Sequence, residues 1–96
     1  MSTIYVKFDC YHEKREAFVE AVKKEGILSA IRAEDGCIAY EYYYSDSDEN
    51  ELLLIEAWES KHHQQIHLEQ PHMARLREIK DGYIKTTTLG EFEIKS

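Results

Sequence analysis

The chain has 96 residues, a length that predicts one domain spanning residues 1–96. Its formal net charge is −7, and its 12 Lys and Arg side chains are interleaved with 19 Asp and Glu. A nucleic-acid site or an anionic membrane site needs clustered basic side chains, so we expect neither partner. No apolar run approaches the ~18 residues of a membrane span, and the first six residues lack the pattern of a signal peptide. We therefore expect a cytoplasmic protein.

The two cysteines, Cys10 and Cys37, lack the spacing of a Cys-x-x-Cys redox motif or a zinc knuckle. In a reducing compartment a structural disulfide is rare, and free cysteines are commonly buried as small apolar side chains. We expect both residues to be free thiols on strands.

The N-terminal half predicts a strand, a helix and a second strand. Apolar and polar side chains alternate over residues 3–10, which indicates a strand with one buried face. Helical spacing of apolar residues follows from about 12 to 33, and Gly26 would loosen that helix. A turn signal at residues 35–36 leads into a Tyr-rich strand over 37–44.

The second half predicts a hairpin partner and then two helices. Residues 51–58 form a third strand, joined to the second by the polar loop 45–50. Ser60 is a good N-cap for a helix over residues 61–69.

A further helix and a last strand complete the prediction. Pro71 stops the preceding helix and can begin the next, which we expect Gly82 to end. Residues 83–94 then form the final strand, bent at Gly90.

The resulting order, β-α-β-β-α(α)-β, is typical of an α+β ferredoxin-like fold, an antiparallel four-stranded sheet with helices on one face. In that topology the first strand lies between the third and fourth, and the second strand is an edge. The third strand carries apolar groups on both faces (Leu52, Leu53, Leu54, Ile55 and Ala57). A second copy of the chain would cover the rear face, so we expect a two-fold homodimer. The alternative is a central strand that is simply rich in Leu.

Several short motifs resemble one known family. The segment Glu-Asp-Gly-Cys-Ile-Ala-Tyr at 34–40, the segment Glu-Ala-Trp-Glu-Ser at 56–60, His67 and the Pro-His pair at 71–72 are together similar to the antibiotic biosynthesis monooxygenase domain. Small bacterial quinol monooxygenases and autoinducer-processing proteins share that pattern. The resemblance implies a dimeric α+β barrel, in which two sheets pack face to face and each protomer holds a cavity between sheet and helices.

The resemblance also implies a range of activities. Many members oxidise electron-rich aromatic or quinol substrates with dioxygen and without a bound metal or flavin, whereas others degrade haem, isomerise or only bind. Haem-degrading relatives place an Asn on the first strand, where this chain has Val6, Phe8 and Cys10. They also carry a liganding His on the later helix, which residues 74–78 lack. Both departures argue against haem degradation.

Three titratable residues are candidates for catalysis. The resemblance places a His at position 67, and a neutral imidazole can take a proton from a substrate hydroxyl. Glu56 would share a strand face with Trp58, where desolvation would raise its pKa and make it a base or an anchor for a histidine. His72 follows Pro71 at a corner between helices and could bind a hydroxyl or anionic group. The alternatives are a hydrogen-bonded structural histidine, a structural ion pair and a helix cap, respectively.

An aromatic wall and a metal site were the other possibilities. Tyr40, Tyr42 and Trp58 could bind a flat substrate, and the alternative is ordinary core packing. A face carrying Ile38, Tyr40, Tyr42 and Tyr44 follows from alternation of the second strand. His63 and His67 have a spacing that occurs in zinc sites, but a metal site needs a third and a fourth ligand, and no acidic residue lies between them as in the metalloprotease pattern, so we expect no metal. The family resemblance implies that no cofactor is needed.

These observations favour a cofactor-independent monooxygenase that oxidises a small quinol or phenol with dioxygen. His67, assisted by Glu56 or His72, would deprotonate the substrate in a dry pocket. Two alternatives remain, namely an acid–base isomerase of a small hydroxy-carbonyl compound and a non-catalytic dimeric binding module.

Overall fold

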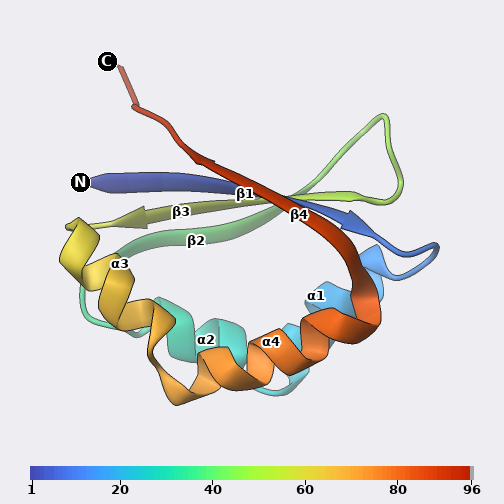
Figure 1. The fold of residues 1–96 in the computed structure, drawn as a ribbon, viewed down its shortest axis with the longest axis horizontal. Coiled ribbons are helices and arrows are strands. Elements are labelled where there is room, and N and C mark those ends of the chain that lie inside the picture. Colours follow the sequence, from blue (N-terminus) through green and yellow to red (C-terminus); the bar gives the residue numbers. More distant parts are fainter. Residues whose placement is uncertain (96) are drawn as a thin grey trace.

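An antiparallel sheet with its helices on one face makes up residues 1–95, the part of the chain that the computed structural model describes (Figure 1). Within those residues the strands lie in the order β2-β3-β1-β4. Their bounds are Ser2–Cys10 for β1, Cys37–Tyr44 for β2, Glu51–Trp58 for β3 and Ile84–Glu91 for β4. The predicted fold class and strand order are both confirmed.

The helices form the second layer (Figure 1). Their bounds are Arg15–Lys24 for α1, Ile27–Arg32 for α2, Lys61–Leu68 for α3 and Pro71–Tyr83 for α4. No helix within residues 1–95 is long and apolar enough to cross a membrane.

The core lies between these two layers and follows from strand alternation. In the register of β1 with β3, Val6 lies opposite Leu54 and Phe8 opposite Leu52, and these four side chains are buried against the helices. Phe18, which the helical spacing places on the inner side of α1, is fully buried against Phe8, with ring centroids 5.9 Å apart. Cross-strand apolar pairs of this kind are the main stabilising unit of a sheet.

Three sequence predictions about the bounds of helices and strands need correction. The helix expected over residues 12–33 is two helices, because Gly26 adopts a left-handed conformation at φ 73° and redirects the chain between α1 and α2. Gly82 does not end α4; the helix continues to Tyr83 and passes directly into β4, so no left-handed stop is needed. The final strand ends at Glu91 rather than at residue 94.

A bulge in β2 corrects one face assignment. The register with β3 shifts between Cys37 and Ala39, so that Cys37 packs against the core and Ile38 is 54% exposed. Ile38 therefore does not share the helix-facing surface with Tyr40. A bulge reverses the side-chain alternation that a sequence pattern assumes.

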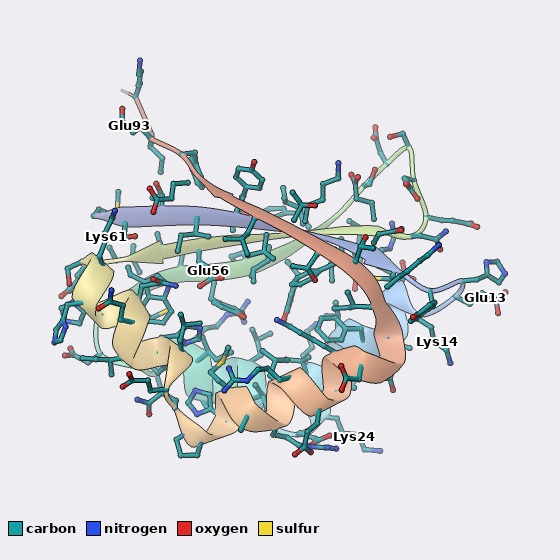
Figure 2. All side chains as sticks on the ribbon, viewed as in Figure 1. Glu13, Lys14, Lys24, Glu56, Lys61 and Glu93 are labelled. Atoms are coloured by element: carbon teal, nitrogen blue, oxygen red, sulfur yellow. The ribbon has the colours of Figure 1, made fainter. Side chains whose placement is uncertain are left out.

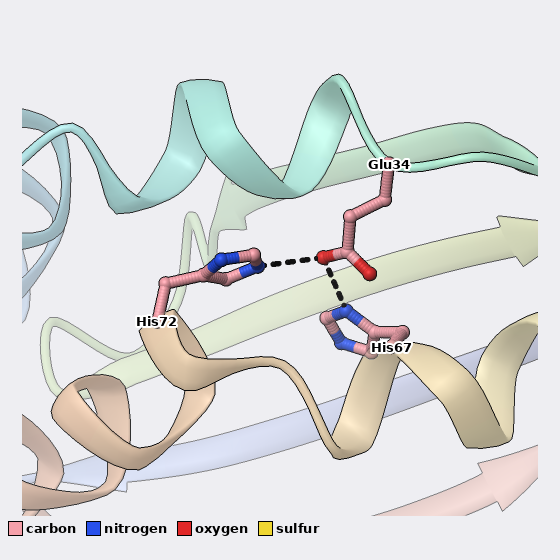
Figure 3. Close-up of side chains that lie close together, drawn as sticks. All are labelled: Glu34, His67 and His72. Carbon is pink, nitrogen blue, oxygen red and sulfur yellow. Dashed lines mark hydrogen bonds and ion pairs between the residues drawn. The ribbon is translucent and has the colours of Figure 1, made fainter.

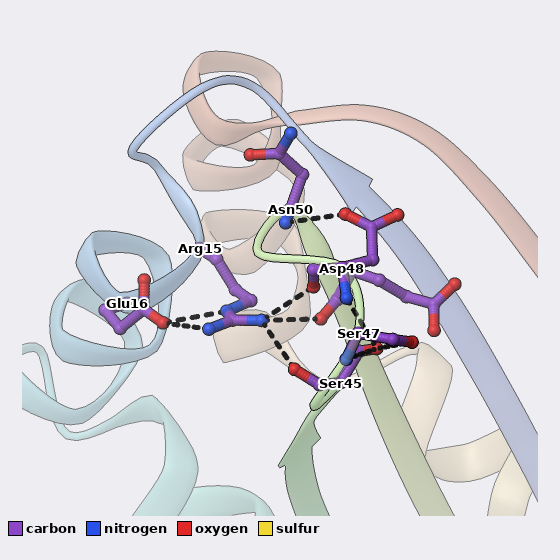
Figure 4. Close-up of polar contacts among 7 residues, drawn as sticks. Arg15, Glu16, Ser45, Ser47, Asp48 and Asn50 are labelled. Atoms are coloured by element: carbon purple, nitrogen blue, oxygen red, sulfur yellow. Dashed lines mark hydrogen bonds and ion pairs between the residues drawn. The ribbon is translucent and has the colours of Figure 1, made fainter.

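Arg15 at the start of α1 holds the loop between β2 and β3 (Figure 4). Its guanidinium donates to the main-chain oxygens of Ser45, Asp48 and Glu51 at 3.3, 2.9 and 3.3 Å. The same group lies 4.7 Å from the centre of the Tyr44 ring. These contacts fix the hairpin against the helical layer at the end of the sheet opposite to α3.

The sheet face away from the helices carries a mixed aromatic and aliphatic surface. Tyr5 lies opposite Ile55, and Leu53 lies opposite Tyr43, which is 53% exposed. Leu53 and Ile55 are only half-buried, whereas their neighbours on the other side of β3 are fully buried. The predicted two-faced character of β3 is present, and the homodimer remains a prediction.

Candidate functional site

The imidazoles of His67 and His72 both contact one carboxylate oxygen of Glu34 (Figure 3). Glu34 follows α2, His67 lies in the last turn of α3, and His72 lies in the first turn of α4. Oε2 of Glu34 is 2.8 Å from Nδ1 of His67 and 2.8 Å from Nε2 of His72. The side chains of His67, Glu34 and His72 are 1%, 10% and 21% exposed, so the cluster runs from the interior to the surface.

Local structure explains why these residues meet. The Ser60 side chain caps α3 by accepting the main-chain N–H of His63 at 3.2 Å, as the sequence predicted. Pro71 occupies the first turn of α4, and the short connection between the helices is closed by the N–H of Gln70 donating to the carbonyl of His67 at 3.1 Å. His67 and His72 are thereby held on adjacent turns.

His67 contacts a second acidic group on its inner side. Its Nε2 lies 3.9 Å from Oε1 of Glu56, and that oxygen accepts a hydrogen bond from Nε1 of Trp58 at 3.0 Å. The imidazole packs on the indole of Trp58 at a centroid distance of 4.5 Å and an angle of 31°. Tyr40 meets the same imidazole edge-on at 5.8 Å. His67 is thus enclosed by two carboxylates and two aromatic rings.

Burial changes the acid–base properties of this interior. Desolvation raises the pKa of Glu56, and the opposing effects of the Trp58 hydrogen bond and of His67 are smaller. Figure 2 shows Glu56 between the sheet and the helices, whereas other acidic side chains such as Glu13 and Glu93 extend from the periphery. Burial also raises the pKa of Tyr40 well above its ordinary value. Both groups are therefore biased toward their neutral forms.

A lysine that the sequence analysis did not select faces the same interior. The ammonium of Lys80 on α4 lies 5.1 Å from the centre of the fully buried Phe8 ring. Burial lowers the pKa of Lys80, and the charge of Glu56 partly opposes that shift. The sequence does indicate this position: Lys80 follows the buried Leu76 by four residues, which places both side chains on the same face of α4.

The structure places the predicted site residues as follows. Glu56, His67 and Trp58 are in mutual contact, Tyr40 packs on His67, and His72 joins through Glu34.

Tyr42 lies farther along β2 and does not contact His67. Its ring is 6.0 Å from those of Phe18 and Tyr40, and its hydroxyl is buried without a hydrogen-bond partner in residues 1–95. Glu34 was quoted within a family motif but not selected as a site residue, since nothing local indicates a contact 33 positions along the chain.

The nearest hollow opens on the outer side of the cluster. It has a volume of about 240 Å³ and is lined by Glu34, Asp35, His63, Ile66 and Gln70. Glu34 is the member of the cluster that borders it. His67 and Trp58 lie behind it and are almost fully buried, so neither of them lines this hollow.

The donor atoms of Glu34, His67 and His72 all lie within 4.8 Å of one another, so these residues could ligate a divalent metal. Two imidazoles and one carboxylate suit zinc or iron. Each nitrogen is nevertheless at hydrogen-bond distance from one shared oxygen, an arrangement that satisfies the donors without a metal. His63, the other residue considered for zinc, is instead 2.7 Å from Oγ of Ser60 through its Nδ1.

Residues 1–79 match the family model for antibiotic biosynthesis monooxygenase. The chain belongs to this family. Most of the fold and every member of the cluster lie within the matched residues, so the monooxygenase assignment applies at the level of the family.

Solved structures agree on the fold. A protein from Pseudomonas aeruginosa superposes with a TM-score of 0.84 at 17% identity, covering 99% of this chain and 94% of its own. A crystal structure of an antibiotic biosynthesis monooxygenase superposes with a TM-score of 0.81 at 20% identity, covering 100% of both chains. A Mycobacterium tuberculosis protein gives 0.80 at 24% identity, covering 99% of this chain and 95% of its own.

A sequence relative is known from Synechocystis. This uncharacterized protein is 27% identical over 60 residues, which cover 62% of the present chain. The matched residues span only 40% of the Synechocystis protein, so the similarity concerns part of a longer chain.

Proposed function

We propose that this family member is a cofactor-independent monooxygenase that oxidises a small quinol or phenol with dioxygen. One observation carries the proposal. The buried imidazole of His67 lies between the carboxylates of Glu34 and Glu56 and packs on the Trp58 indole at 4.5 Å. A histidine beside a flat aromatic surface, shielded from water, is suited to remove a proton from an aromatic hydroxyl.

The chemistry needs no external reductant. Proton transfer from the substrate hydroxyl to His67 leaves an electron-rich anion, which passes an electron to dioxygen. The two radicals combine at a ring carbon that bears hydrogen, protonated His67 returns its proton to the resulting peroxide, and loss of water gives a quinone. One oxygen atom enters the product and the other leaves as water, so the substrate supplies all four electrons.

The surrounding residues would support each step. The ammonium of Lys80 would favour the substrate anion, and the edge of Tyr40 and the face of Trp58 would orient the ring. His72 would contribute through Glu34 rather than by touching the substrate.

Access to this site would require α3 to move outward. His67 is the one buried residue of α3, whereas Ile66 and Leu68 are 42% and 45% exposed. A helix that buries so little apolar surface is weakly held, and local opening is drawn from such segments. The substrate would replace the packing between His67 and the sheet.

The direct test is oxygen uptake by pure, metal-free protein with a panel of naphthoquinols and catechols. We expect uptake by the native protein and a loss of roughly 10²–10⁴-fold in His67→Ala, the usual range for a general base. His62→Ala is the matched control, because His62 lies exposed on the same helix, and it should retain full activity.

Other outcomes separate the alternatives. Equal uptake by His67→Ala and native protein would refute the role of His67. Anaerobic turnover of a hydroxy-carbonyl compound would instead favour the isomerase. Tight binding without turnover in air or under nitrogen would favour the binding module.

We also propose that a second copy of the chain covers the rear sheet face. The half-buried Leu53 and Ile55 and the exposed Tyr43 support this proposal, because apolar side chains grouped on one exposed sheet face suit an interface with a second copy. Light scattering of the native protein should give the mass of a dimer. Ile55→Glu should give a monomer, whereas Ile66→Glu on the exposed side of α3 should not, and a monomeric native protein would overturn the proposal.

A further inference from the structure

We infer that Glu34 is a positioning residue, whose carboxylate fixes His67 as the tautomer protonated on Nδ1 and leaves Nε2 as the base. This inference rests on the proposed function for its consequence in catalysis. The arrangement itself rests on the geometry of Glu34, His67 and His72 in the resting protein.

One carboxylate oxygen of Glu34 contacts both histidines. Oε2 is 2.8 Å from one nitrogen of His67 and 2.8 Å from one nitrogen of His72. An ionised carboxylate only accepts hydrogen bonds, and a neutral imidazole donates from one nitrogen alone. When Glu34 is ionised, Oε2 can only accept, so both contacts require N–H donors, which are Nδ1 of His67 and Nε2 of His72.

The opposite nitrogen of His67, Nε2, faces the interior. Nε2 lies 3.9 Å from Oε1 of Glu56, beyond hydrogen-bond distance, and that oxygen already accepts from Trp58. The lone pair on Nε2 therefore faces the Glu56–Trp58 side of the imidazole without a hydrogen-bond donor in residues 1–95. This nitrogen is the one that can accept a proton from a substrate placed against Trp58.

The Glu34 carboxylate joins three segments of the helical layer. Glu34 belongs to the segment after α2, His67 lies in the last turn of α3, and His72 lies in the first turn of α4. The two hydrogen bonds link these segments at one point and restrict the rotation of the imidazole.

Several titratable groups surround the imidazole and must be considered in any pH profile. Glu34 and His72 lie on its outer side, and Glu56 from β3, Tyr40 from β2 and Lys80 from α4 lie toward the interior.

The experiment uses ¹⁵N NMR of the histidine side chains in the resting full-length protein. In the native protein we expect neutral His67 as the Nδ1–H tautomer. In Glu34→Gln the carboxamide no longer requires a donor, so the tautomer should shift toward Nε2–H, the form that predominates in free imidazole side chains. Glu59→Gln is the matched control, because that carboxylate lies 3.9 Å from His63 instead, and it should leave the His67 spectrum unchanged.

The kinetic counterpart uses whichever substrate the oxygen-uptake panel identifies. Glu34→Gln should lower kcat about 10²-fold with little change in KM, because the base is misoriented while the substrate contacts are kept. Glu34→Asp should recover part of the rate if its shorter carboxylate still reaches Nδ1.

The outcomes are distinguishable from failure of the proposed function. An Nε2–H tautomer of His67 in the native protein would overturn the inference whatever the variants do and whether or not they fold. Stoichiometric Zn²⁺ binding that moves the His67 and His72 resonances together would also overturn it in favour of a metal site. The expected tautomer in a protein without oxygen uptake would support the arrangement and refute the monooxygenase proposal.

Discussion

The substitution Gly36→Ala tests the turn that brings Glu34 to the histidines. Gly36 adopts φ 82°, and a Cβ built on it would lie 2.4 Å from Cγ and Cδ2 of the His63 ring. Real Cβ contacts do not approach so closely, so the His63 ring would have to move. That ring is held by Ser60, the residue that caps the helix carrying His67.

The expected cost has two parts. A left-handed backbone costs an L-residue about 1 kcal/mol more than glycine. Displacing His63 adds the loss of its hydrogen bond to Ser60, about 1 kcal/mol. Gly26→Ala isolates the first part, because Gly26 has φ 73° and nothing lies within 4 Å of a Cβ there. Gly36→Ala should therefore be the less stable of the two by about 1 kcal/mol, or about 4–8 °C in Tm.

Urea unfolding at equilibrium measures the difference directly. A double-mutant cycle adds His63→Gly, which removes both the ring and its Cβ, itself 2.8 Å from a Cβ built at position 36, and the extra cost of Gly36→Ala should then disappear. Equal stabilities of Gly36→Ala and Gly26→Ala, or no recovery in the double variant, would refute the steric argument.

Three further outcomes follow from burial. The folded native protein binds the Glu56 proton more tightly than the unfolded chain does, so the stability of the native protein should fall as the pH rises above about 4.5. Glu56→Gln should weaken this pH dependence, and urea midpoints from pH 4 to 8 measure it. Lys80→Met should be more stable than the native protein at pH 7, by a margin that shrinks toward pH 10.5, because the native state disfavours the charged Lys80; urea titrations at both pH values check this. Burial raises the pKa of Cys10 to about 11, so Ellman's reagent at pH 8 should modify Cys10 far more slowly in the folded protein than in urea.

Local patterns were sufficient for most of the fold. The strands predicted at 37–44 and 51–58 have those bounds in the structure, and the helix predicted at 61–69 ends one residue earlier. Alternation and helical spacing depend on which side of an element is buried, and a short polar loop such as residues 45–50 separates the elements clearly. The errors at Ile38 and Gly82 occur where a bulge or a direct helix-to-strand passage overrides the local signal.

Part of the candidate site could also be predicted from the sequence, and part could not. Glu56 and Trp58 could be paired from sequence because residues two apart on a strand share a face, and the indole does donate to that carboxylate at 3.0 Å. Lys80 carried a helical spacing signal that was overlooked. Glu34 carried no comparable signal, since its contact with His67 depends on how α2 ends and on how α3 packs against β3.

The amino-acid sequence by itself determined the elements, the buried face of each strand and the presence of histidines after Trp58, because these depend on periodicity over a few residues. Only the tertiary structure decided that one oxygen of Glu34 meets both His67 and His72 and that this cluster closes over the Glu56 carboxylate. The reason is physical: hydrogen bonds of 2.8 Å between residues more than 30 positions apart require three chain segments to pack together, and no pattern within one segment records that packing.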